Sequence, residues 1–309
     1  MSRSGVGAAL CLISAAGFGT MAVFGKLTYE DGLVPGDLLL LRFGLAALGL
    51  AAIAAATGAL RGLTARSVRA GLAMGAVGYA TQSALYFLAL ERMDASVLAL
   101  LLYTYPALVT VAAIVLRRER ATARRLVALG IALAGTALVL AGAGAGALDP
   151  LATLMGIGAA CAYTAYILIG DRVLGGVEPL ALAVLVTAGA TVSFGVAAVV
   201  RGNVNLPPDA AGWSWIAGIA FFSTVIAILT FFAGLARVGP SAAAILSTLE
   251  PVVTVALAAA VFGERLTAIQ LAGGALVLAA VFVLQASGGP VTRRWRARRS
   301  RRTRPATAG

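Results

Sequence analysis

Residues 245–267 read ILSTLEPVVTVALAAAVFGERLT, and residues 100–122 read LLLYTYPALVTVAAIVLRRERAT. The two stretches align at a shift of 145 residues, which places Pro106 on Pro251 and the pair Glu119-Arg120 on Glu264-Arg265. Chance matches among alanine and leucine are common in apolar sequences, but matches of proline and of a Glu-Arg pair are not. Self-similarity at a fixed shift indicates an internal repeat. The chain is therefore predicted to consist of two copies of one structural unit.

The repeat extends well beyond these two stretches. Residues 87–140 lie over residues 232–285 without a gap, and 15 of the 54 aligned pairs are identical. A shift of about 144 also places Ala15-Ala16 and Thr20 on Ala159-Ala160 and Thr164. The two copies are therefore predicted at 5–142 and 151–286, followed by a basic tail at 287–309 that is predicted to be disordered.

Composition places both copies in a membrane. Hydrophobic residues make up 61% of the chain and charged residues only 12%, whereas a soluble domain carries about twice that charged fraction. The apolar residues form runs of about twenty, long enough to cross the hydrocarbon core as helices. A membrane barrel would instead need short alternating strands. Ten runs are predicted to be transmembrane helices, at 5–24, 35–56, 70–90, 94–116, 124–142, 151–170, 179–200, 212–235, 240–262 and 267–286.

Ten helices in two copies give each repeat five helices, which is an odd number. Each helix of the second copy must then cross the membrane in the direction opposite to its counterpart. Inverted-topology repeats are typical of secondary transporters, in which the substrate site lies near the midplane where the repeats meet. The predicted fold class is therefore an all-α membrane protein with ten transmembrane helices arranged as two inverted-topology five-helix repeats.

The distribution of basic residues predicts the orientation. With the N-terminus inside, 19 of the 24 Lys and Arg residues fall on the cytoplasmic side, four fall on the other side, and Arg42 alone lies within a span. This bias predicts a multi-pass inner-membrane protein with both termini in the cytoplasm. The arginines between Arg293 and Arg304 are expected to hold the tail near anionic lipid headgroups. Binding of nucleic acid is not expected.

Several short motifs stand out within the predicted spans and turns. They are Arg42-Phe43, Tyr105-Pro106, Leu116 to Arg120 (LRRER), Leu249-Glu250-Pro251-Val252 and Phe262-Gly263-Glu264-Arg265-Leu266-Thr267. With these residues the chain resembles the drug/metabolite transporter superfamily, specifically its EamA-type ten-helix transporters. The resemblance covers about 8–140 and 151–285. It implies a pseudosymmetric bundle in which helices 1–4 and 6–9 surround a central cavity, and it implies export of amino acids, other metabolites or drugs. The Leu-Glu-Pro stretch is most similar to the amino-acid-exporting branch.

Only two ionisable side chains stand well inside the predicted spans, and such groups are candidates for function. Glu250 lies about ten residues into its helix, where burial favours the neutral carboxyl and would allow exchange of a proton or a cationic substrate. The alternative is a structural carboxylate paired with Arg42 or with backbone donors. Arg42 is interpreted first as an anchor paired with Asp37 or a headgroup. If it faces a cavity, it would favour a carboxylate-bearing substrate.

The other candidate substrate-binding residues are polar side chains in the middle of the spans. Tyr79, Gln82 and Tyr86 follow i, i+3, i+7 spacing and are predicted to share one helix face. The remaining members of the set are Tyr103, Tyr105, Tyr163 and Thr248. Such a set would line a cavity of mixed apolar and polar character, or it would bond neighbouring helices together. Pro106 and Pro251 each remove a backbone donor and are predicted to kink their helices.

Two local motifs predict details of packing. Residues Thr267 to Gln270 fit a capping box at the start of the last predicted span. Gly71 and Gly75 form a GxxxG pair, which predicts a close approach between helices.

The chain carries no signature of an enzyme. It has no phosphate-binding Gly-Lys-Ser/Thr loop, no histidine and no nucleophile triad, so neither catalysis nor a cofactor or metal is expected. The leading prediction is secondary export of an amino acid or similar small metabolite by alternating access, with the proton as the candidate coupling ion. Efflux of drugs or lipophilic cations through the same cavity is one alternative. A membrane scaffold or sensor that acts through the basic tail is another.

Overall fold

The computed structural model describes residues 3–116, 122–142, 149–173, 177–238 and 246–285, and these residues form helices joined by turns, without a strand. The helices are α1 (Arg3–Gly19), α2 (Met21–Glu30), α3 (Pro35–Thr57), α4 (Ala65–Ala73), the π-helix η1 (Met74–Tyr79), α5 (Ala80–Leu90), α6 (Ala95–Leu102), α7 (Tyr105–Val115), α8 (Ala123–Ala141), α9 (Pro150–Val173), α10 (Pro179–Arg201), α11 (Ala210–Ala220), the π-helix η2 (Phe221–Ile226), α12 (Ala227–Val238), α14 (Leu249–Phe262) and α15 (Ala268–Gln285). The all-helical prediction is confirmed for this part of the chain. The predicted basic tail and Glu119-Arg120 lie outside the described residues.

Several helices begin where a side chain satisfies free backbone amides. The Thr64 hydroxyl accepts a hydrogen bond from an amide in the first turn of α4 at 3.1 Å, and the Asp209 carboxylate does the same for α11 at 2.9 Å. Gly202 ends α10 with φ +79°, a conformation that favours glycine. At α15, the Thr267 amide donates to Gln270 Oε1 at 2.9 Å and the Gln270 amide donates to Thr267 Oγ1 at 3.2 Å. The predicted capping box is therefore confirmed.

Six helical stretches are long and apolar enough to cross a membrane. They are Gly5–Glu30, Pro35–Thr57, Ala95–Ala112, Pro150–Ile169, Pro179–Arg201 and Ala210–Leu235. Shorter apolar helices cover Leu126–Ala141, Leu249–Phe262 and Ala268–Val283 within the described residues. The chain is thus a multi-pass membrane protein by helix length and composition, and the predicted number of ten crossings remains a prediction.

Several predicted spans differ from the observed helices. The first, predicted at 5–24, extends to Glu30 but is interrupted between α1 and α2, so Lys26 lies in a helix rather than in a connection. The interruption occurs at Thr20, whose hydroxyl bonds the carbonyl of Gly17 at 2.7 Å and the hydroxyl of Ser223 at 2.8 Å. The spans predicted at 70–90 and 212–235 each contain a π-helix, η1 and η2 respectively. Hydropathy is insensitive to such local changes of helix type.

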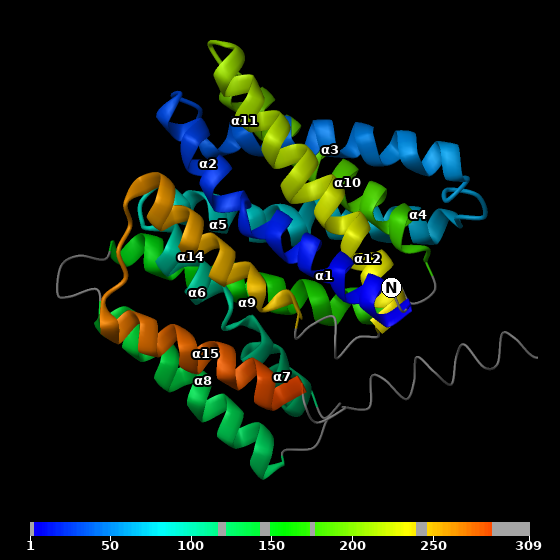
Figure 1. The fold of residues 1–309 in the computed structure, drawn as a ribbon. Coiled ribbons are helices and arrows are strands. Elements are labelled where there is room, and N and C mark those ends of the chain that lie inside the picture. Colours follow the sequence, from blue (N-terminus) through cyan, green and yellow to red (C-terminus); the bar gives the residue numbers. More distant parts are fainter. Residues whose placement is uncertain (1–2, 117–121, 143–148, 174–176, 239–245, 286–309) are drawn as a thin grey trace, which may run out of the picture.

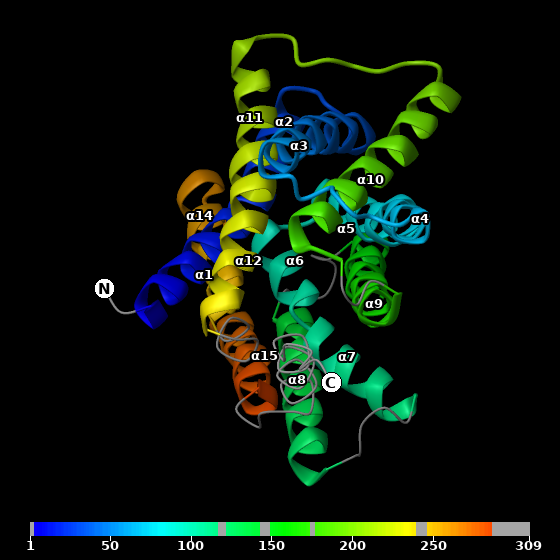
Figure 2. The same ribbon diagram turned by 90° about the vertical axis from the view of Figure 1, so that its right-hand side faces the viewer.

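The helices pack as pairs that join the two halves of the sequence. In Figures 1 and 2, α8 and α15 lie side by side, next to α7 and apart from α3 and α10. The other extensive pairs are α1 with α12, α3 with α10, α5 with α9 and α6 with α14. Every one of these pairs joins a helix from the first half of the chain to one from the second half.

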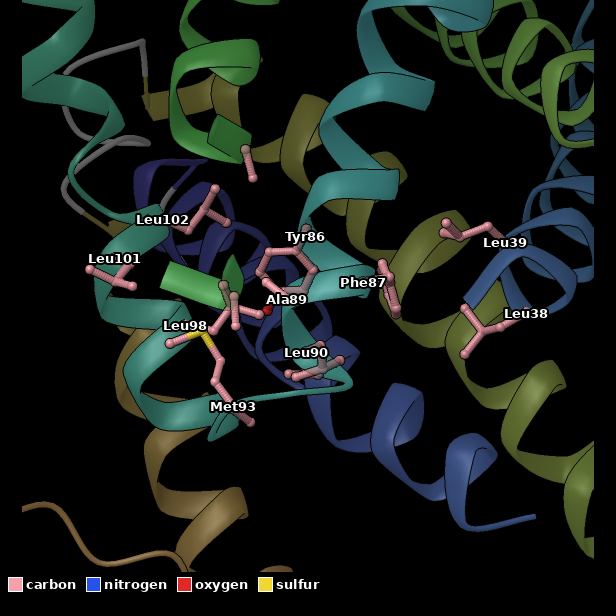
Figure 3. Close-up of a cluster of buried hydrophobic side chains, with 14 of the residues drawn as sticks. Leu38, Leu39, Tyr86, Phe87, Ala89, Leu90, Met93, Leu98, Leu101 and Leu102 are labelled. Carbon is pink, nitrogen blue, oxygen red and sulfur yellow. The ribbon is translucent and has the colours of Figure 1, made fainter. Parts of the chain in front are cut away.

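The main core lies where α3, α5 and α6 meet. Figure 3 shows Leu38 and Leu39 of α3, Phe87 of α5 and Leu98 of α6 within the same buried cluster. Close approach of helices is made possible by small residues. A Cβ added to Gly71 would lie 2.8 Å from the Leu185 side chain of α10, so a larger residue does not fit there. The close packing predicted from the Gly71–Gly75 pair is therefore observed between α4–η1 and α10.

Candidate functional site

Two helix breaks face each other near the middle of the molecule. The first lies at Tyr103 and Thr104, between α6 and α7, and the second lies at Thr248, before α14. Pro106 is the second residue of α7 and Pro251 is the third residue of α14. Proline is well tolerated in the first turn of a helix because its missing N–H would have no intrahelical partner there. The two prolines predicted to kink their helices thus come just after local breaks in the helices.

A tyrosine hydroxyl connects the two breaks. Tyr103 Oη donates to the backbone carbonyl of Ser247, and it also lies 3.2 Å from Glu250 Oε2. Backbone carbonyls released at a helix break need donors from elsewhere, and Tyr103 supplies one from the opposite break. The Thr254 hydroxyl donates in the same way, to the carbonyl of Gly19 at the end of α1 at 3.0 Å. These hydrogen bonds therefore connect the end of α1, the end of α6 and the start of α14.

Glu250 lies in the first turn of α14. It was predicted about ten residues inside an uninterrupted helix, and the interruption at Thr248 corrects that position. A carboxylate is favourable in the first turn because the helix dipole places partial positive charge there. The side chain is partly buried, and none of the described lysines and arginines lies within 4 Å of it. The alternative in which Arg42 pairs with Glu250 is therefore wrong.

A chain of aromatic rings leads away from Glu250 toward α3. The successive ring pairs have centroids 4.7–6.2 Å apart, and they are Tyr103–Tyr105, Tyr105–Tyr163, Tyr163–Tyr166, Tyr166–Tyr79 and Tyr79–Phe43. Contacts of this separation and tilt are favourable between aromatic groups. The predicted candidates Tyr79, Tyr103, Tyr105 and Tyr163 therefore belong to one contiguous set, which sequence spacing alone did not indicate.

Arg42 occupies the far end of this ring chain. Only 1% of its surface is exposed. Its Nε donates to the hydroxyl of Thr224 in η2 at 3.0 Å, and the carbon centre of its guanidinium lies 4.9 Å from the Phe43 ring and 5.4 Å from the Phe87 ring. Stacking of guanidinium on aromatic rings is favourable and fixes its plane. The Nη2 atom, in contrast, is buried and has no hydrogen-bond partner among the residues that the structure describes.

Arg42 also lines a small internal cavity. The cavity has a volume of about 20 Å³, and its wall consists of Met21, Arg42, Tyr79, Gln82, Ser83, Tyr86 and Phe87. The i, i+3, i+7 spacing of Tyr79, Gln82 and Tyr86 predicted a shared face, and the three side chains do line one cavity. The Tyr86 ring is labelled in Figure 3 beside Phe87. Because its wall combines a cation, two phenols and an amide, the cavity is suited to a small polar group.

The predicted pairing of Arg42 with Asp37 is wrong. Asp37 is fully buried, and its carboxylate accepts hydrogen bonds from Arg201 and, at 3.0 Å, from the amide of Asn205. Five residues separate Asp37 from Arg42, and at about 100° per residue the two side chains leave α3 roughly 140° apart. Asp37 therefore pairs toward α10, while Arg42 points into the bundle. Thr248, the remaining candidate, is buried at the break before α14.

A second polar cluster, at Glu264, was not anticipated. Glu264 Oε1 accepts from Lys26 Nζ at 2.8 Å and from the Ala95 amide at 3.0 Å, while Oε2 accepts from the Ser96 amide at 3.0 Å and the Ser96 hydroxyl at 2.8 Å. Partial burial opposes ionisation, but these donors outweigh it and lower the pKa of Glu264 below its ordinary value of 4.5. The repeat places Glu264 at a recurring position, but it does not indicate the contact of Glu264 with Ser96.

Comparison with known proteins agrees with this architecture. Residues 5–141 and residues 150–285 each match the EamA-like transporter family. Among solved structures, a chain described only as "Crystal structure of protein" is 21% identical, covers 95% of this chain and 99% of its own length, and superposes with a TM-score of 0.64. That likeness shows a shared fold. No protein with a curated description matches the chain. Since the two family matches together cover most of the sequence, this membrane protein belongs to the EamA-like transporter family.

Proposed function

We propose that the chain is a secondary transporter that exports an amino acid or similar small metabolite by alternating access, in exchange for protons. The observation that carries the proposal is the position of Glu250. It is a partly buried carboxyl at a helix break, held by Tyr103 and without a cation in contact among the described residues. A carboxyl in such a place changes its charge at low cost when a proton or an ammonium group arrives.

The packing pattern supports two inverted repeats. At the shift found in the sequence, α1 corresponds to α9 and α5 to α12. Because α14 corresponds to α7, the pair α1–α12 exchanges with α9–α5 and the pair α1–α14 with α9–α7, while α3–α10 and α8–α15 each map onto themselves. The two π-helices η1 and η2 also fall at corresponding places. A two-fold relation of this kind, with ten crossings and repeats at 5–142 and 151–286, is the arrangement in which alternating access operates.

The charge bias supports an orientation with both termini in the cytoplasm of an inner membrane. In this arrangement the basic tail at 287–309 lies against anionic lipid headgroups. Reporter enzymes fused after the tail and within the connection between α10 and α11 test the orientation. The first fusion is expected to report the cytoplasm and the second the opposite side.

Reconstitution into liposomes tests transport and coupling together. Labelled amino acids, nucleosides and cationic drugs are offered with and without a pH gradient across the vesicle membrane. The wild-type protein is expected to move an amino acid faster with the gradient, and Glu250→Gln is expected to abolish that stimulation. Glu30→Gln is the matched control, because Glu30 is an exposed carboxylate at the end of α2. No flux for any solute would contradict transport, and full stimulation in Glu250→Gln would contradict the coupling role.

Efflux of lipophilic cations is the second candidate function, and it is favoured because no lysine or arginine among the described residues contacts Glu250. The buried positive charge of Arg42 in the cavity wall opposes it. The same liposome experiment separates the two, since a cation exporter would move cationic drugs and leave amino acids in place.

A further inference from the structure

A buried positive charge in the bundle has no counter-charge among the described residues. Only 1% of the surface of Arg42 is exposed, and no carboxylate of the described residues lies within 4 Å of its guanidinium. Asp37, the acidic residue nearest to it in the sequence, bonds instead to Arg201 and to the amide of Asn205. An arginine keeps its proton even when it is buried. The positive charge is therefore present, and the described residues do not compensate it.

The neighbours of this guanidinium hold it without neutralising it. Its Nε donates to the Thr224 hydroxyl at 3.0 Å, and its carbon centre lies 4.9 Å from the Phe43 ring and 5.4 Å from the Phe87 ring. The titratable groups that interact most strongly with it are the phenols of Tyr79 and Tyr86, which are neutral at physiological pH. Aromatic rings and hydroxyl dipoles lower the cost of a buried cation, but a buried charge is usually paired.

One nitrogen of the guanidinium remains without a bond. Nη2 is buried and has no hydrogen-bond partner among the residues that the structure describes. A buried charged donor left unbonded costs more than a neutral one. In folded proteins such a donor typically bonds to an ordered water or an ion when the chain supplies no acceptor. Arg42 therefore calls for a small ligand that accepts hydrogen bonds.

The cavity beside Arg42 limits the size of that ligand. Its volume of about 20 Å³ slightly exceeds the space that one water molecule requires. A monoatomic ion fits into this volume, whereas sulfate, phosphate or an organic acid does not. The ligand is therefore either a water molecule or a single small ion.

The wall of the cavity is rich in hydrogen-bond donors. It contains the side chains of Tyr79, Gln82 and Tyr86 in addition to Arg42, and none of the described residues in the wall is acidic. The Ser83 hydroxyl donates to Gln82 Oε1 at 3.3 Å, which leaves the NH₂ group of that amide, with its two N–H donors, for another acceptor. A wall that combines one cation with phenol and amide donors suits an anion of single charge.

We propose that this cavity is a binding site for a monovalent halide, chloride being the abundant member of the class, and that the bound ion is the counter-charge of Arg42. A water molecule would accept a hydrogen bond but would leave the buried charge uncompensated. A chloride ion does both, since it accepts hydrogen bonds and carries one negative charge. The proposal does not rest on the proposed transport function, because it assigns the ion as a bound component and not as a transported solute.

Thermal unfolding of the purified protein in detergent tests the site. Sodium chloride is compared with sodium gluconate at equal ionic strength, because gluconate is too large for the cavity. The unfolding temperature of the wild type is expected to rise with chloride concentration, on the order of 2–4 °C for each tenfold increase above the dissociation constant. Bromide is expected to replace chloride. Equal unfolding temperatures in chloride and gluconate would overturn the proposal and leave water as the occupant.

Variants locate the chloride effect at the cavity. Gln82→Glu places a carboxylate in the wall, so the protein supplies its own counter-charge and the dependence on chloride should disappear. Arg42→Gln should also lose it, while Arg265→Gln, at an exposed arginine, should keep it. A folded Arg42→Gln protein with the full chloride effect would overturn the proposal. If Arg42→Gln does not fold, Gln82→Glu decides, and a full chloride effect in that variant would overturn the proposal.

Equilibrium dialysis with radioactive chloride adds a measurement that needs no unfolding. The wild type is expected to bind one chloride per chain, and bromide is expected to displace it. The absence of saturable binding to the wild type, or equal binding to Gln82→Glu, would contradict the site. None of these measurements involves transport. A lack of solute flux would therefore leave the halide site standing, and a lack of halide binding would leave proton coupling through Glu250 standing.

Discussion

The Ser96 hydroxyl donates a hydrogen bond of 2.8 Å to Glu264, although 168 residues separate them in the sequence. The same carboxylate caps the first turn of α6 through the Ala95 and Ser96 amides and pairs with Lys26 of α2. Glu264, in the turn between α14 and α15, therefore bonds to both α2 and the start of α6 at one end of the bundle. In the proposed orientation this end is the outer one, so the Glu264 cluster would lie at the outer side of the protein.

Loss of the Glu264 carboxylate is expected to destabilise the protein. A hydrogen bond to a charged group contributes about 1.5–3 kcal/mol, and Glu264 makes several, so Glu264→Gln should lower the thermal unfolding temperature in detergent. Ser96→Ala should produce a smaller decrease, because the Ser96 amide remains. Glu30→Gln serves as the control, and an unfolding temperature of Glu264→Gln equal to that of this control would refute the assigned role.

The stabilisation by Glu264 is expected to depend on pH. Its pKa in the folded protein is lower than the ordinary value of 4.5, so the unfolded chain takes up the proton first as pH falls. The contribution is therefore complete above pH 4.5 and disappears as pH drops through the folded value. The difference in unfolding temperature between the wild type and Glu264→Gln should be constant from pH 8 to about pH 5.5 and shrink below pH 4.5. A difference that grows on acidification would be inconsistent with this sign.

The α8–α15 contact is expected to tolerate no side chain at its crossing point. A Cβ on Gly135 would lie 2.7 Å from the carbonyl oxygen of Gly273, and one on Gly273 would lie 2.6 Å from that of Gly135. Gly135→Ala should therefore cost about 1–3 kcal/mol of stability through overpacking. Gly130→Ala on the same helix is the matched control, since nothing lies within 4 Å of a Cβ there. Equal unfolding temperatures for the two variants would show that the helices separate easily.

The Asp37–Arg201 pair joins a fully buried carboxylate to a partly exposed arginine, and removal of one partner alone is expected to destabilise the protein. Arg201→Gln leaves the buried carboxylate without its cation, which should cost less than the ~3–5 kcal/mol typical of a pair with both partners buried. The double variant Asp37→Asn with Arg201→Gln removes both charges and should recover part of the loss. A double-mutant cycle on thermal unfolding measures the coupling. Additive effects of the two substitutions would argue against a direct interaction.

The sequence predicted those parts of the fold that depend on local spacing. The i, i+3, i+7 pattern placed Tyr79, Gln82 and Tyr86 on one wall, and the residues from Thr267 to Gln270 formed their capping box because both features lie within two helical turns. The presence of long apolar helices also followed from the sequence, because the apolar runs are long enough to cross a membrane.

The contacts between distant segments could not be predicted in the same way. Arg42 is surrounded by Thr224 and Phe87, which come from other helices, so its proximity to Asp37 in the sequence was misleading. The interruptions at Thr20, Tyr103 and Thr248 left no trace in hydropathy, because apolar residues continue across them. The repeat marked Glu264 as recurring, but a shift between copies gives no distance between Glu264 in one copy and Ser96 in the other.

Proton movement that accompanies solute flux is the most direct test of proton coupling through Glu250. Liposomes containing the protein and a pH-sensitive dye are exposed to the amino acid that it moves, without an imposed pH gradient. We expect a solute gradient to drive a change of luminal pH in wild-type and Glu30→Gln vesicles, and we expect Glu250→Gln vesicles to exchange solute without that change. Proton movement of equal size in Glu250→Gln vesicles would contradict proton coupling through Glu250.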